Sequence, residues 1–379
     1  MEPNDPLKKT LRRRTHGAST RQRRDRSVSP EQTRHFQQAA RPRILCTLPW
    51  LPKQAAAILA AGAEVCYMAP ERSRLLETIG QFDAWWLHFD TRCDREMLER
   101  ASRLRVVCTA TTGTDHIDRE EAGRRGVRVL SIAKDRGLLD TFTATAELNW
   151  MLVLGLMRHM RAAVRAAHDG DWADGSVRFE GLQLRGRTLG VVGLGRLGTM
   201  TARYGNAFGM EVLGNDLAPV ALPDVRQVDL PDLLKRSDVI CIHVHLTQET
   251  RHLFDKNALL QVKHGAALVN TSRGDIVDEE AVIEALESGR LAGYAADVLH
   301  DEWNASMSHN PLVRYARDHD NVILTPHIGG ATRDSVTAAR NFTARKLVHF
   351  LRTGQELTWR SRAEPESDAA AEGGGLSSR

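Results

Sequence analysis

From residue 43 onward, hydrophobic residues occur in short runs that alternate with longer stretches of helical periodicity. Five short runs are rich in β-branched and other hydrophobic residues, and helix-like stretches, such as 53–61 and 94–101, lie between them. These five runs lie at 43–47, 64–68, 83–87, 105–109 and 127–131. Short β-rich runs between helical stretches predict a parallel sheet with helices on both faces.

A second series of the same kind begins at residue 188. Its predicted strands lie at 189–192, 212–215, 239–243, 267–270, 293–296 and 322–324. Between the two series, hydrophobic residues at helical intervals, such as Leu148 and Leu152, predict a long helix over 143–161. A last helix is predicted over 333–351, and Gly354 follows as its stop signal. The chain is therefore predicted to be an α/β protein with two sheets in succession.

The first strand of the second series runs directly into three glycines in the pattern Gly-x-Gly-x-x-Gly. Gly193 permits a tight turn, Gly195 lets backbone amides approach a pyrophosphate, and Gly198 lets the next helix pack close to the strand. Asp216 closes the following strand, 18 residues beyond Gly198, where a carboxylate accepts hydrogen bonds from ribose hydroxyls. This order predicts dinucleotide binding, and NAD rather than NADP because Asp216 would repel a 2′-phosphate.

The length of 379 residues suggests two domains, and the formal charge of +4 is unevenly distributed. Residues 1–43 carry twelve Lys and Arg against four Asp and Glu, a formal +8, so the remainder carries −4. Residues 1–42 hold too few hydrophobic side chains to bury a core, which predicts a disordered basic extension. An alternative is that these basic residues contact nucleic acid or another acidic surface, but we do not favour a nucleic-acid partner. The polar, glycine-rich residues 356–379 predict a disordered tail.

Several other classes of protein are disfavoured by what the sequence lacks. No stretch approaches 18 uncharged apolar residues and the N-terminus has no apolar signal segment, so we expect no membrane partner. The five cysteines are an odd number and widely spaced, which predicts buried free thiols without metal-ligand spacing. We therefore expect a cytoplasmic protein with no metal site.

Three segments of the second half follow predicted strands and carry side chains suited to a hydride transfer. Such segments lie at the carboxyl edge of the sheet, where ligands bind. Arg273 can hold a carboxylate in bidentate geometry. His327 can protonate a carbonyl oxygen near neutral pH, and Glu302 beside it would stabilise the imidazolium and fix its tautomer. Each residue alone is ordinary for a turn, a cap or a loop, but together they predict reduction of a 2-oxo acid.

These segments resemble the motif series of the D-isomer-specific 2-hydroxyacid dehydrogenases, the phosphoglycerate dehydrogenase-like group, over roughly residues 43–355. The resemblance implies two flavodoxin-like/Rossmann doubly wound parallel-sheet domains with an interdomain cleft. Residues 43–142 and 328–355 would form the substrate domain, and residues 143–327 the NAD-binding Rossmann domain. The resemblance also implies a homodimer and reversible hydride transfer between NAD(H) and a small-molecule 2-hydroxy or 2-oxo acid.

The resemblance further implies roles residue by residue. Arg273 would anchor the substrate, His327 would donate the proton, and Glu302 would be the partner of the histidine. Backbone amides of one loop would meet the substrate carboxylate, and this loop contains Thr112, Gly113 and Thr114. The implied cofactor-binding residues are Gly193, Gly195, Arg196, Leu197, Gly198, Asp216, Thr271, Ser272, Arg273, Asp297, His327, Gly329 and Gly330.

Two departures from the family pattern bear on the substrate. The segment 131–147 is longer than usual and contains Lys134, Asp135 and Arg136. In addition, Trp303 stands where the family has proline. Both features would rim the substrate site, so phosphoglycerate-like acids and sugar acids are both candidates.

Two other functions use a similar scaffold. One is an NAD(H)-sensing binding protein like the related transcriptional corepressors, and the basic extension would suit such a role. The other is formate dehydrogenase, which is less favoured because that subgroup carries glutamine where Glu302 stands. Turnover of 2-oxo acids discriminates between these functions and the dehydrogenase.

Overall fold

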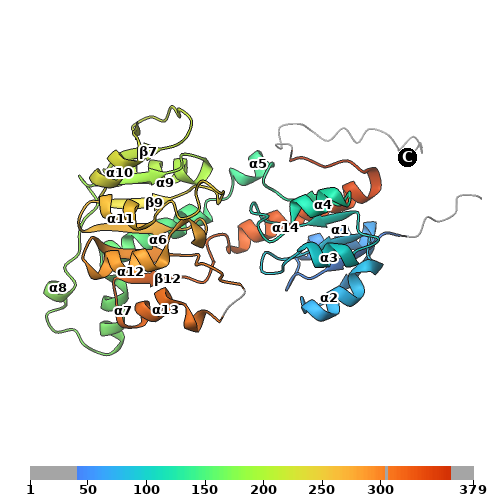
Figure 1. The fold of residues 1–379 in the computed structure, drawn as a ribbon, viewed down its shortest axis with the longest axis horizontal. Helices are drawn as coiled ribbons and strands as arrows, with labels where there is room; N and C mark the ends of the chain where they lie inside the picture. Colours follow the sequence, from blue (N-terminus) through green and yellow to red (C-terminus); the bar gives the residue numbers. More distant parts are fainter. Residues whose placement is uncertain (1–40, 304–305, 360–379) are drawn as a thin grey trace, which may run out of the picture. The chain divides into compact units, whose positions relative to one another are not determined.

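The computed structural model describes residues 41–303 and 306–359. The described residues from Pro42 onward belong to one compact unit, which contains two parallel sheets with helices packed against them (Figure 1). Residues 1–40 of the predicted basic extension (1–42) and residues 360–379 of the predicted tail (356–379) lie outside the described residues.

The first domain is built on a five-stranded parallel sheet in the order β2-β1-β3-β4-β5. Its strands are β1 (Arg43–Cys46), β2 (Glu64–Tyr67), β3 (Ala84–Trp86), β4 (Val106–Cys108) and β5 (Arg128–Leu130). Its helices are α1 (Lys53–Gly62), α2 (Arg72–Thr78), η2 (Ile79–Gln81), α3 (Arg95–Arg100), α4 (Arg119–Arg124) and α5 (Arg136–Leu139). The five predicted strands are confirmed, and their ends differ from the prediction by at most one residue.

The second domain is built on a seven-stranded parallel sheet in the order β12-β11-β10-β9-β6-β7-β8. Its strands are β6 (Thr188–Val192), β7 (Glu211–Asn215), β8 (Arg226–Gln227), β9 (Val239–Ile242), β10 (Ala266–Asn270), β11 (Leu291–Ala296) and β12 (Val322–Leu324). Six of these strands were predicted and are confirmed. The short strand β8 was not predicted, because its Arg and Gln carry no hydrophobic signal.

Helices and 3₁₀ turns connect the strands of this second sheet. They are α6 (Ala144–Met157), α7 (Met160–His168), α8 (Gly175–Arg178), α9 (Arg196–Ala207), α10 (Leu230–Arg236), α11 (Lys256–Gln261), η3 (Gly274–Ile276), α12 (Glu279–Glu287), η4 (Met307–His309) and α13 (Pro311–Asp318). Several begin where a side chain supplies the missing acceptor. Asp255 accepts from Ala258 N at the start of α11, and Asp278 does the same for Ala281 N in α12.

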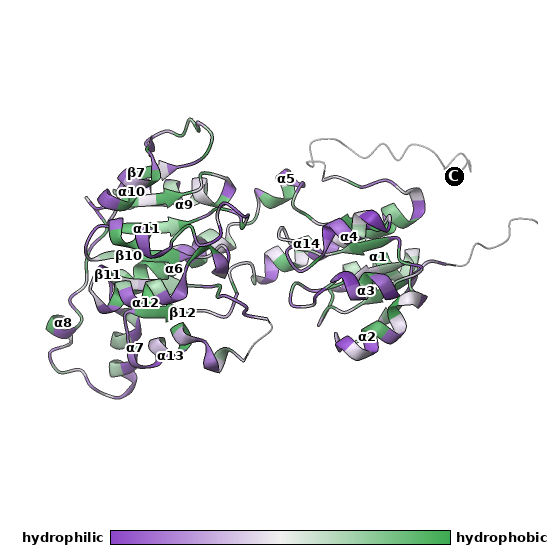
Figure 2. Ribbon diagram, in the orientation of Figure 1, coloured by the Kyte–Doolittle hydropathy of each residue, from purple (hydrophilic) through white to green (hydrophobic). Residues whose placement is uncertain are grey.

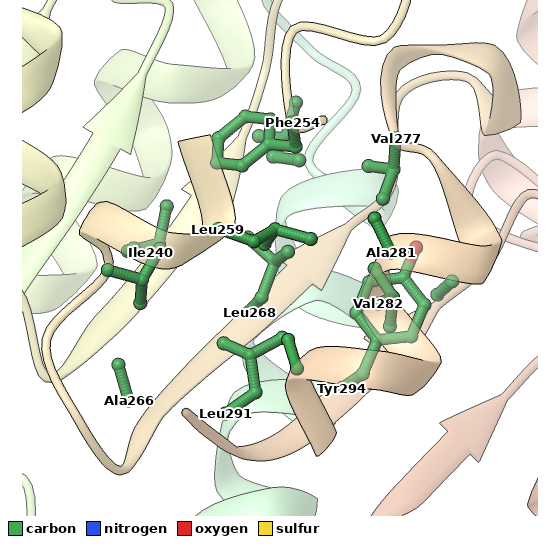
Figure 3. Close-up of a cluster of buried hydrophobic side chains, with 14 of the residues drawn as sticks. Ile240, Phe254, Leu259, Ala266, Leu268, Val277, Ala281, Val282, Leu291 and Tyr294 are labelled. Atoms are coloured by element: carbon green, nitrogen blue, oxygen red, sulfur yellow. The ribbon is translucent and has the colours of Figure 1, made fainter. Parts of the chain in front are cut away.

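The strands form because helices bury them on both faces. Every residue of β9 and β10 is buried, as is typical of central parallel strands. In one core cluster, Phe254, Leu259 and Leu268 pack between the sheet and its helices (Figure 3). Figure 2 shows hydrophobic residues concentrated on the strands and polar residues on loops and outer helix surfaces.

The last helix, α14 (Arg333–Thr353), packs on the first domain although it follows the second in sequence. Its Leu347 lies in the same hydrophobic cluster as Ile44 and Leu59, and Figure 1 shows the helix beside α1. The helix ends at Gly354, whose φ of 72° is the left-handed conformation that glycine adopts easily. The stop signal at Gly354 is therefore confirmed.

A buried ion pair ties α14 to the segment between β5 and α6. Lys346 Nζ lies 2.7 Å from Asp135 Oδ2 and 3.0 Å from Glu356 Oε1, and the side chains of Lys346 and Asp135 are fully buried. The backbone amide of Trp359 donates to Asp135 Oδ1 over 2.8 Å. The expectation that Asp135 rims the substrate site is therefore wrong, because its charge is matched inside the domain. Residues 356–359 pack on this domain rather than belonging to the predicted tail.

The predicted long helix over 143–161 is two helices. Between α6 and α7, His159 adopts a left-handed conformation with φ 50°. The carbonyl of Met157 at the end of α6 accepts from Leu182 N over 2.8 Å. A Cβ on Gly181 would lie 2.4 Å from the same carbonyl oxygen, so the chain crosses the helix end closely. This tertiary contact, and not a local stop signal, accompanies the break.

All five cysteines are free; Cys46, Cys93, Cys108 and Cys241 are buried, whereas Cys66 is partly exposed, against expectation. Within residues 41–303 and 306–359, no helix combines the length and the hydropathy needed to cross a membrane.

Candidate active site

The glycine turn after β6 has the geometry of an anion-binding loop. Gly193 has φ 94°, and a Cβ on Gly198 would lie 1.8 Å from the carbonyl oxygen of Gly193. Both positions therefore require glycine. A Cβ on Gly195 would meet nothing within 4 Å, so the space above that backbone is open. Helix α9 begins at Arg196 without a side-chain cap or an acidic residue in its first turn, which leaves its amide groups for a ligand.

Asp216 lies beside this turn at the end of β7. Its Oδ2 accepts from the backbone amide of Leu194 over 2.7 Å, and its Oδ1 lies 3.3 Å from Ala218 N. The carboxylate is therefore fixed next to the loop that the pyrophosphate would approach. Acceptor capacity remains on both oxygens for ribose hydroxyls.

The side chain of Arg196 does not point to the open space above the turn. Its Nη1 donates to the carbonyls of Leu139 and Phe142, over 2.9 and 2.5 Å. Burial lowers the pKa of Arg196 from its ordinary value. At this position the side chain of Arg196 is therefore occupied, and its backbone amide is the group that faces the start of the helix.

Asp297, at the end of β11, organises the loop that carries His327. Its Oδ1 accepts from Thr325 Oγ1 over 2.6 Å and from Ile328 N over 2.8 Å, and its Oδ2 accepts from Gly329 N over 2.7 Å. A Cβ on Gly329 would lie 2.9 Å from Oδ2, which explains the glycine. Asp297 is 2 % exposed, and its carboxylate mainly holds this loop in place.

His327 is held in one orientation by its backbone and by Glu302. Its φ of 53° is left-handed, an uncommon conformation for a non-glycine residue, and its amide donates to the carbonyls of Asp297 and Thr325. Nδ1 of His327 lies 2.7 Å from Oε1 of Glu302, and Oε2 of Glu302 accepts from Leu299 N over 3.3 Å. The Nδ1 proton therefore faces the carboxylate, and Nε2 is left for a substrate.

Thr271, Ser272 and Arg273 follow β10. Thr271 Oγ1 is buried and has no hydrogen-bond partner among the described residues, whereas Ser272 Oγ donates to Ile242 O over 2.8 Å. Arg273 donates from Nε to Asp115 Oδ2 over 2.8 Å and from Nη1 to Ser272 O over 2.7 Å. Its second terminal nitrogen keeps its donors for a ligand.

The loop that follows β4 meets Arg273. A Cβ on Gly113 would lie 1.9 Å from Nη2 of Arg273, so only glycine permits this approach. The hydroxyl of Thr111 donates to Gly113 O over 2.7 Å, and Thr114 O accepts from Ile117 N over 3.0 Å. Thr112 is exposed in the same loop. The structure thus brings the loop 112–114 and the arginine together.

These residues fit a dinucleotide cofactor. The open backbone at Gly195, the uncapped start of α9 and the fixed carboxylate of Asp216 match the pyrophosphate and ribose of NAD. The unpartnered hydroxyl of Thr271 is a buried polar group that a bound ligand would satisfy. Gly330, whose Cβ would meet nothing within 4 Å, is likewise open.

Two residues near the site carry no implied role. Phe89, in the segment after β3, has its ring centroid 5.1 Å from that of His327, and Asp115 holds Arg273. The only sequence signal for Phe89 is its place just beyond a predicted strand of the first sheet. Trp303 was noted as a departure from the family pattern, and its ring lies 5.4 Å from that of His327.

Comparisons with known proteins agree with this geometry. Residues 150–329 match the family model of the D-isomer specific 2-hydroxyacid dehydrogenase NAD-binding domain. A glyoxylate reductase of Thermofilum pendens is 35% identical over 290 residues, which cover 75% of this chain and 82% of that protein. A D-3-phosphoglycerate dehydrogenase of Methanocaldococcus jannaschii is 35% identical over 286 residues, which cover 74% of this chain but only 52% of that protein. The chain thus spans about half the length of that relative.

A solved structure gives the same result for the fold. A D-lactate dehydrogenase of Aquifex aeolicus, crystallised with NAD and lactic acid, matches with a TM-score of 0.73 and 26% identity. The match covers 82% of this chain and 96% of that one. The chain therefore belongs to the D-isomer specific 2-hydroxyacid dehydrogenase family, and it is an NAD(P)-dependent oxidoreductase acting on CH–OH donors.

Proposed function

We propose that this protein is an NAD-dependent D-2-hydroxyacid dehydrogenase that transfers a hydride reversibly between NAD(H) and a 2-hydroxy or 2-oxo acid. One observation carries the proposal. Arg273, Glu302 and His327 follow three adjacent parallel strands, β10, β11 and β12, and so share one carboxyl edge of the sheet. This edge is where ligands bind in such sheets.

In this mechanism Arg273 holds the carboxylate of the substrate. Its planar fork suits a carboxylate, and Asp115 and Ser272 O fix its orientation. Backbone amides of Thr112, Gly113 and Thr114 are proposed to assist. These contacts would place C2 of the substrate for attack and keep its carbonyl oxygen toward His327.

His327 is proposed to donate a proton from Nε2 to the carbonyl oxygen. Bound NADH supplies the hydride that adds to C2, so the product is the 2-hydroxy acid. Glu302 stabilises the imidazolium form and holds its Nδ1 proton. In the oxidative direction the neutral ring takes the hydroxyl proton, and the same carboxylate again stabilises the charged ring.

We propose the following residues as the cofactor site: Gly193, Gly195, Arg196, Leu197, Gly198, Asp216, Thr271, Ser272, Arg273, Asp297, His327, Gly329 and Gly330. Residues 143–327 would form the NAD-binding domain. Residues 43–142 with 328–355 would form the substrate domain, which the packing of α14 on the first sheet supports. The position of Asp216 supports NAD over NADP.

We further propose a homodimer. Large hydrophobic side chains are exposed along α6, α7 and the segment that follows: Met151 (52%), Met160 (50%), Trp172 (77%) and Val177 (74%). Burial of these side chains by a second copy would be favourable. Light scattering at micromolar concentration tests this, and the mass of a single chain would refute it.

The five free cysteines support a reducing, cytoplasmic location.

The decisive experiment is oxidation of NADH by the full chain with a panel of 2-oxo acids. The panel contains glyoxylate, pyruvate, 3-phosphohydroxypyruvate (the oxo form of phosphoglycerate) and a sugar-derived 2-oxo acid. The first three are chosen because relatives are named for these acids or for their reduced forms. Turnover of at least one of them supports the dehydrogenase. Tight NADH binding without any turnover would favour the corepressor-like alternative instead.

A further inference from the structure

Two aromatic rings flank the proposed proton donor. The ring centroids of Trp303 and His327 are 5.4 Å apart, and those of Phe89 and His327 are 5.1 Å apart. Phe89 and Trp303 also meet each other edge to face, with centroids 5.1 Å apart and planes at 68°. The three rings therefore form one contiguous cluster, which we call the aromatic wall (Phe89 and Trp303 beside His327).

The aromatic wall is not part of a hydrophobic core. Among the described residues, neither Phe89 nor Trp303 packs within any of the buried clusters of the two domains. Trp303 is 43% exposed, and Phe89 is only partly buried. Large rings that remain accessible beside a reactive group present an apolar surface to a ligand.

Carboxylates lie next to the aromatic wall on both of its sides. His88, which precedes Phe89, has its Nδ1 3.0 Å from Asp90 Oδ1. On the other side, Arg92 lies 4.0 Å from Asp301. A substrate with a second anionic group would therefore meet the carboxylates of Asp90 and Asp301 here, and it would lose hydration against the rings.

The geometry points to a substrate class. C2 of a 2-oxo acid bears its carboxylate, its oxygen and one further group. If the carboxylate is held by Arg273 and the oxygen faces Nε2 of His327, as proposed above, this further group would lie against the rings that flank the imidazole. We infer that Phe89 and Trp303 select 2-oxo acids with an apolar or aromatic side chain over glyoxylate and over phosphorylated acids. The inference rests on the proposed function and makes its substrate class specific.

The size of the expected effect follows from apolar recognition. One extra methylene group on a substrate, buried against a hydrophobic surface, changes kcat/KM by roughly 10- to 200-fold. For the full chain with saturating NADH, we expect kcat/KM with phenylpyruvate or 4-methyl-2-oxopentanoate to exceed that with glyoxylate by about tenfold or more. The same margin is expected over 3-phosphohydroxypyruvate.

Variants separate selection by the aromatic wall from a general role in folding. Trp303→Ala should lower the phenylpyruvate-to-glyoxylate ratio of kcat/KM by about tenfold or more, chiefly through a higher KM for phenylpyruvate. Trp303→Phe keeps a ring and should restore most of the ratio. Leu260→Ala removes an exposed hydrophobic side chain on α11 and is the matched control, which should leave the ratio unchanged. NADH binding, followed by fluorescence, shows that each variant is folded.

The outcomes distinguish this inference from the proposed function. If phenylpyruvate, 4-methyl-2-oxopentanoate, glyoxylate and 3-phosphohydroxypyruvate all fail to oxidise NADH, both the proposed dehydrogenase activity and the proposed selection are contradicted. Turnover that is fastest with glyoxylate or 3-phosphohydroxypyruvate supports the dehydrogenase but overturns the selection. A Trp303→Ala variant that loses activity toward all acids in the same proportion also overturns it, because the ring would then only position His327.

Discussion

Nδ1 of His327 lies 2.7 Å from Oε1 of Glu302, and this contact decides which nitrogen of the ring is available for chemistry. A carboxylate accepts and does not donate, so the ring proton on this side belongs to Nδ1. Nε2 is then the nitrogen that we propose exchanges a proton with the substrate. The left-handed backbone of His327 and the hydrogen bonds around Asp297 hold the ring in this position.

The first prediction concerns this pair. His327→Ala should lower kcat for reduction by about 10²–10⁴-fold, the usual contribution of a positioned acid, while NADH still binds. Glu302→Gln should also lower kcat, because the neutral amide no longer stabilises the imidazolium. Stopped-flow NADH oxidation measures both. Exposed His264 provides the control, His264→Ala. Near-normal kcat in His327→Ala would contradict the assigned role.

The second prediction concerns the substrate anchor. Arg273→Ala should raise KM for the 2-oxo acid by at least about tenfold, because a charge-assisted bidentate hydrogen bond is lost. Arg273→Lys should recover little, since lysine lacks the planar fork. Steady-state kinetics at saturating NADH measure the change, with Arg203→Ala on the exposed face of α9 as the control. An unchanged KM in Arg273→Ala would exclude the anchor role.

The third prediction concerns cofactor choice. Asp216 is fixed beside the glycine turn, so NADH should bind at least about tenfold more tightly than NADPH, a difference of about 1.4 kcal/mol. Asp216→Ala should narrow this gap, because it removes both an acceptor and a repulsive charge. Calorimetric dissociation constants for the two cofactors test it, with Glu284→Gln on α12 as the control. Equal affinities in the parent protein would be incompatible with the prediction.

The fourth prediction concerns the buried pair of Lys346 and Asp135. Lys346→Met leaves the Asp135 carboxylate buried without its cation and should lower the free energy of unfolding by about 3–5 kcal/mol. The double variant Lys346→Met/Asp135→Leu removes both charges and should recover most of the loss. Thermal denaturation of the three proteins measures this. If the double variant is no more stable than the single one, the pair is not the cause.

The fifth prediction concerns His243, at the end of β9. Its two ring nitrogens are out of contact with solvent and have no partner among the described residues, and burial lowers its pKa to about 4. The unfolded chain, with an ordinary value of 6.5, therefore binds a proton more readily between these pH values. Stability should fall as the pH falls from 7 to 5, by about 2 kcal/mol from this residue.

Comparison of variants isolates the share of His243 in that loss. His116, whose pKa burial also lowers to about 4, contributes in the same direction and window. In His243→Gln, the decrease in melting temperature between pH 7 and pH 5 should be smaller than in the parent protein. The control is His245→Gln, at an exposed position, which should show the same decrease as the parent. Identical decreases in parent and His243→Gln would show that the buried ring is not the titrating group.

The sequence by itself determined the parallel strands and the glycine turn. Runs such as Val239–Ile242 are hydrophobic throughout because both faces of a central parallel strand are buried, and this signal is local. The requirement for glycine at Gly193 and Gly198 is also local, since it follows from a positive φ and from one close backbone approach. The order Arg273, Glu302, His327 could be read for the same reason: each follows a strand that the sequence marks.

Only the tertiary structure decided which side chains meet across long separations in sequence. The break after α6 depends on Leu182 reaching the carbonyl of Met157, and no residue near 158 announces it. The burial of Asp135 depends on Lys346, more than 200 residues away, so its charge was mistaken for a sign of exposure. The ring of Phe89 carries no motif, and its place beside His327 follows from the packed fold. Local patterns determine elements and turns, but a partner supplied by a distant segment is visible only once the chain has folded.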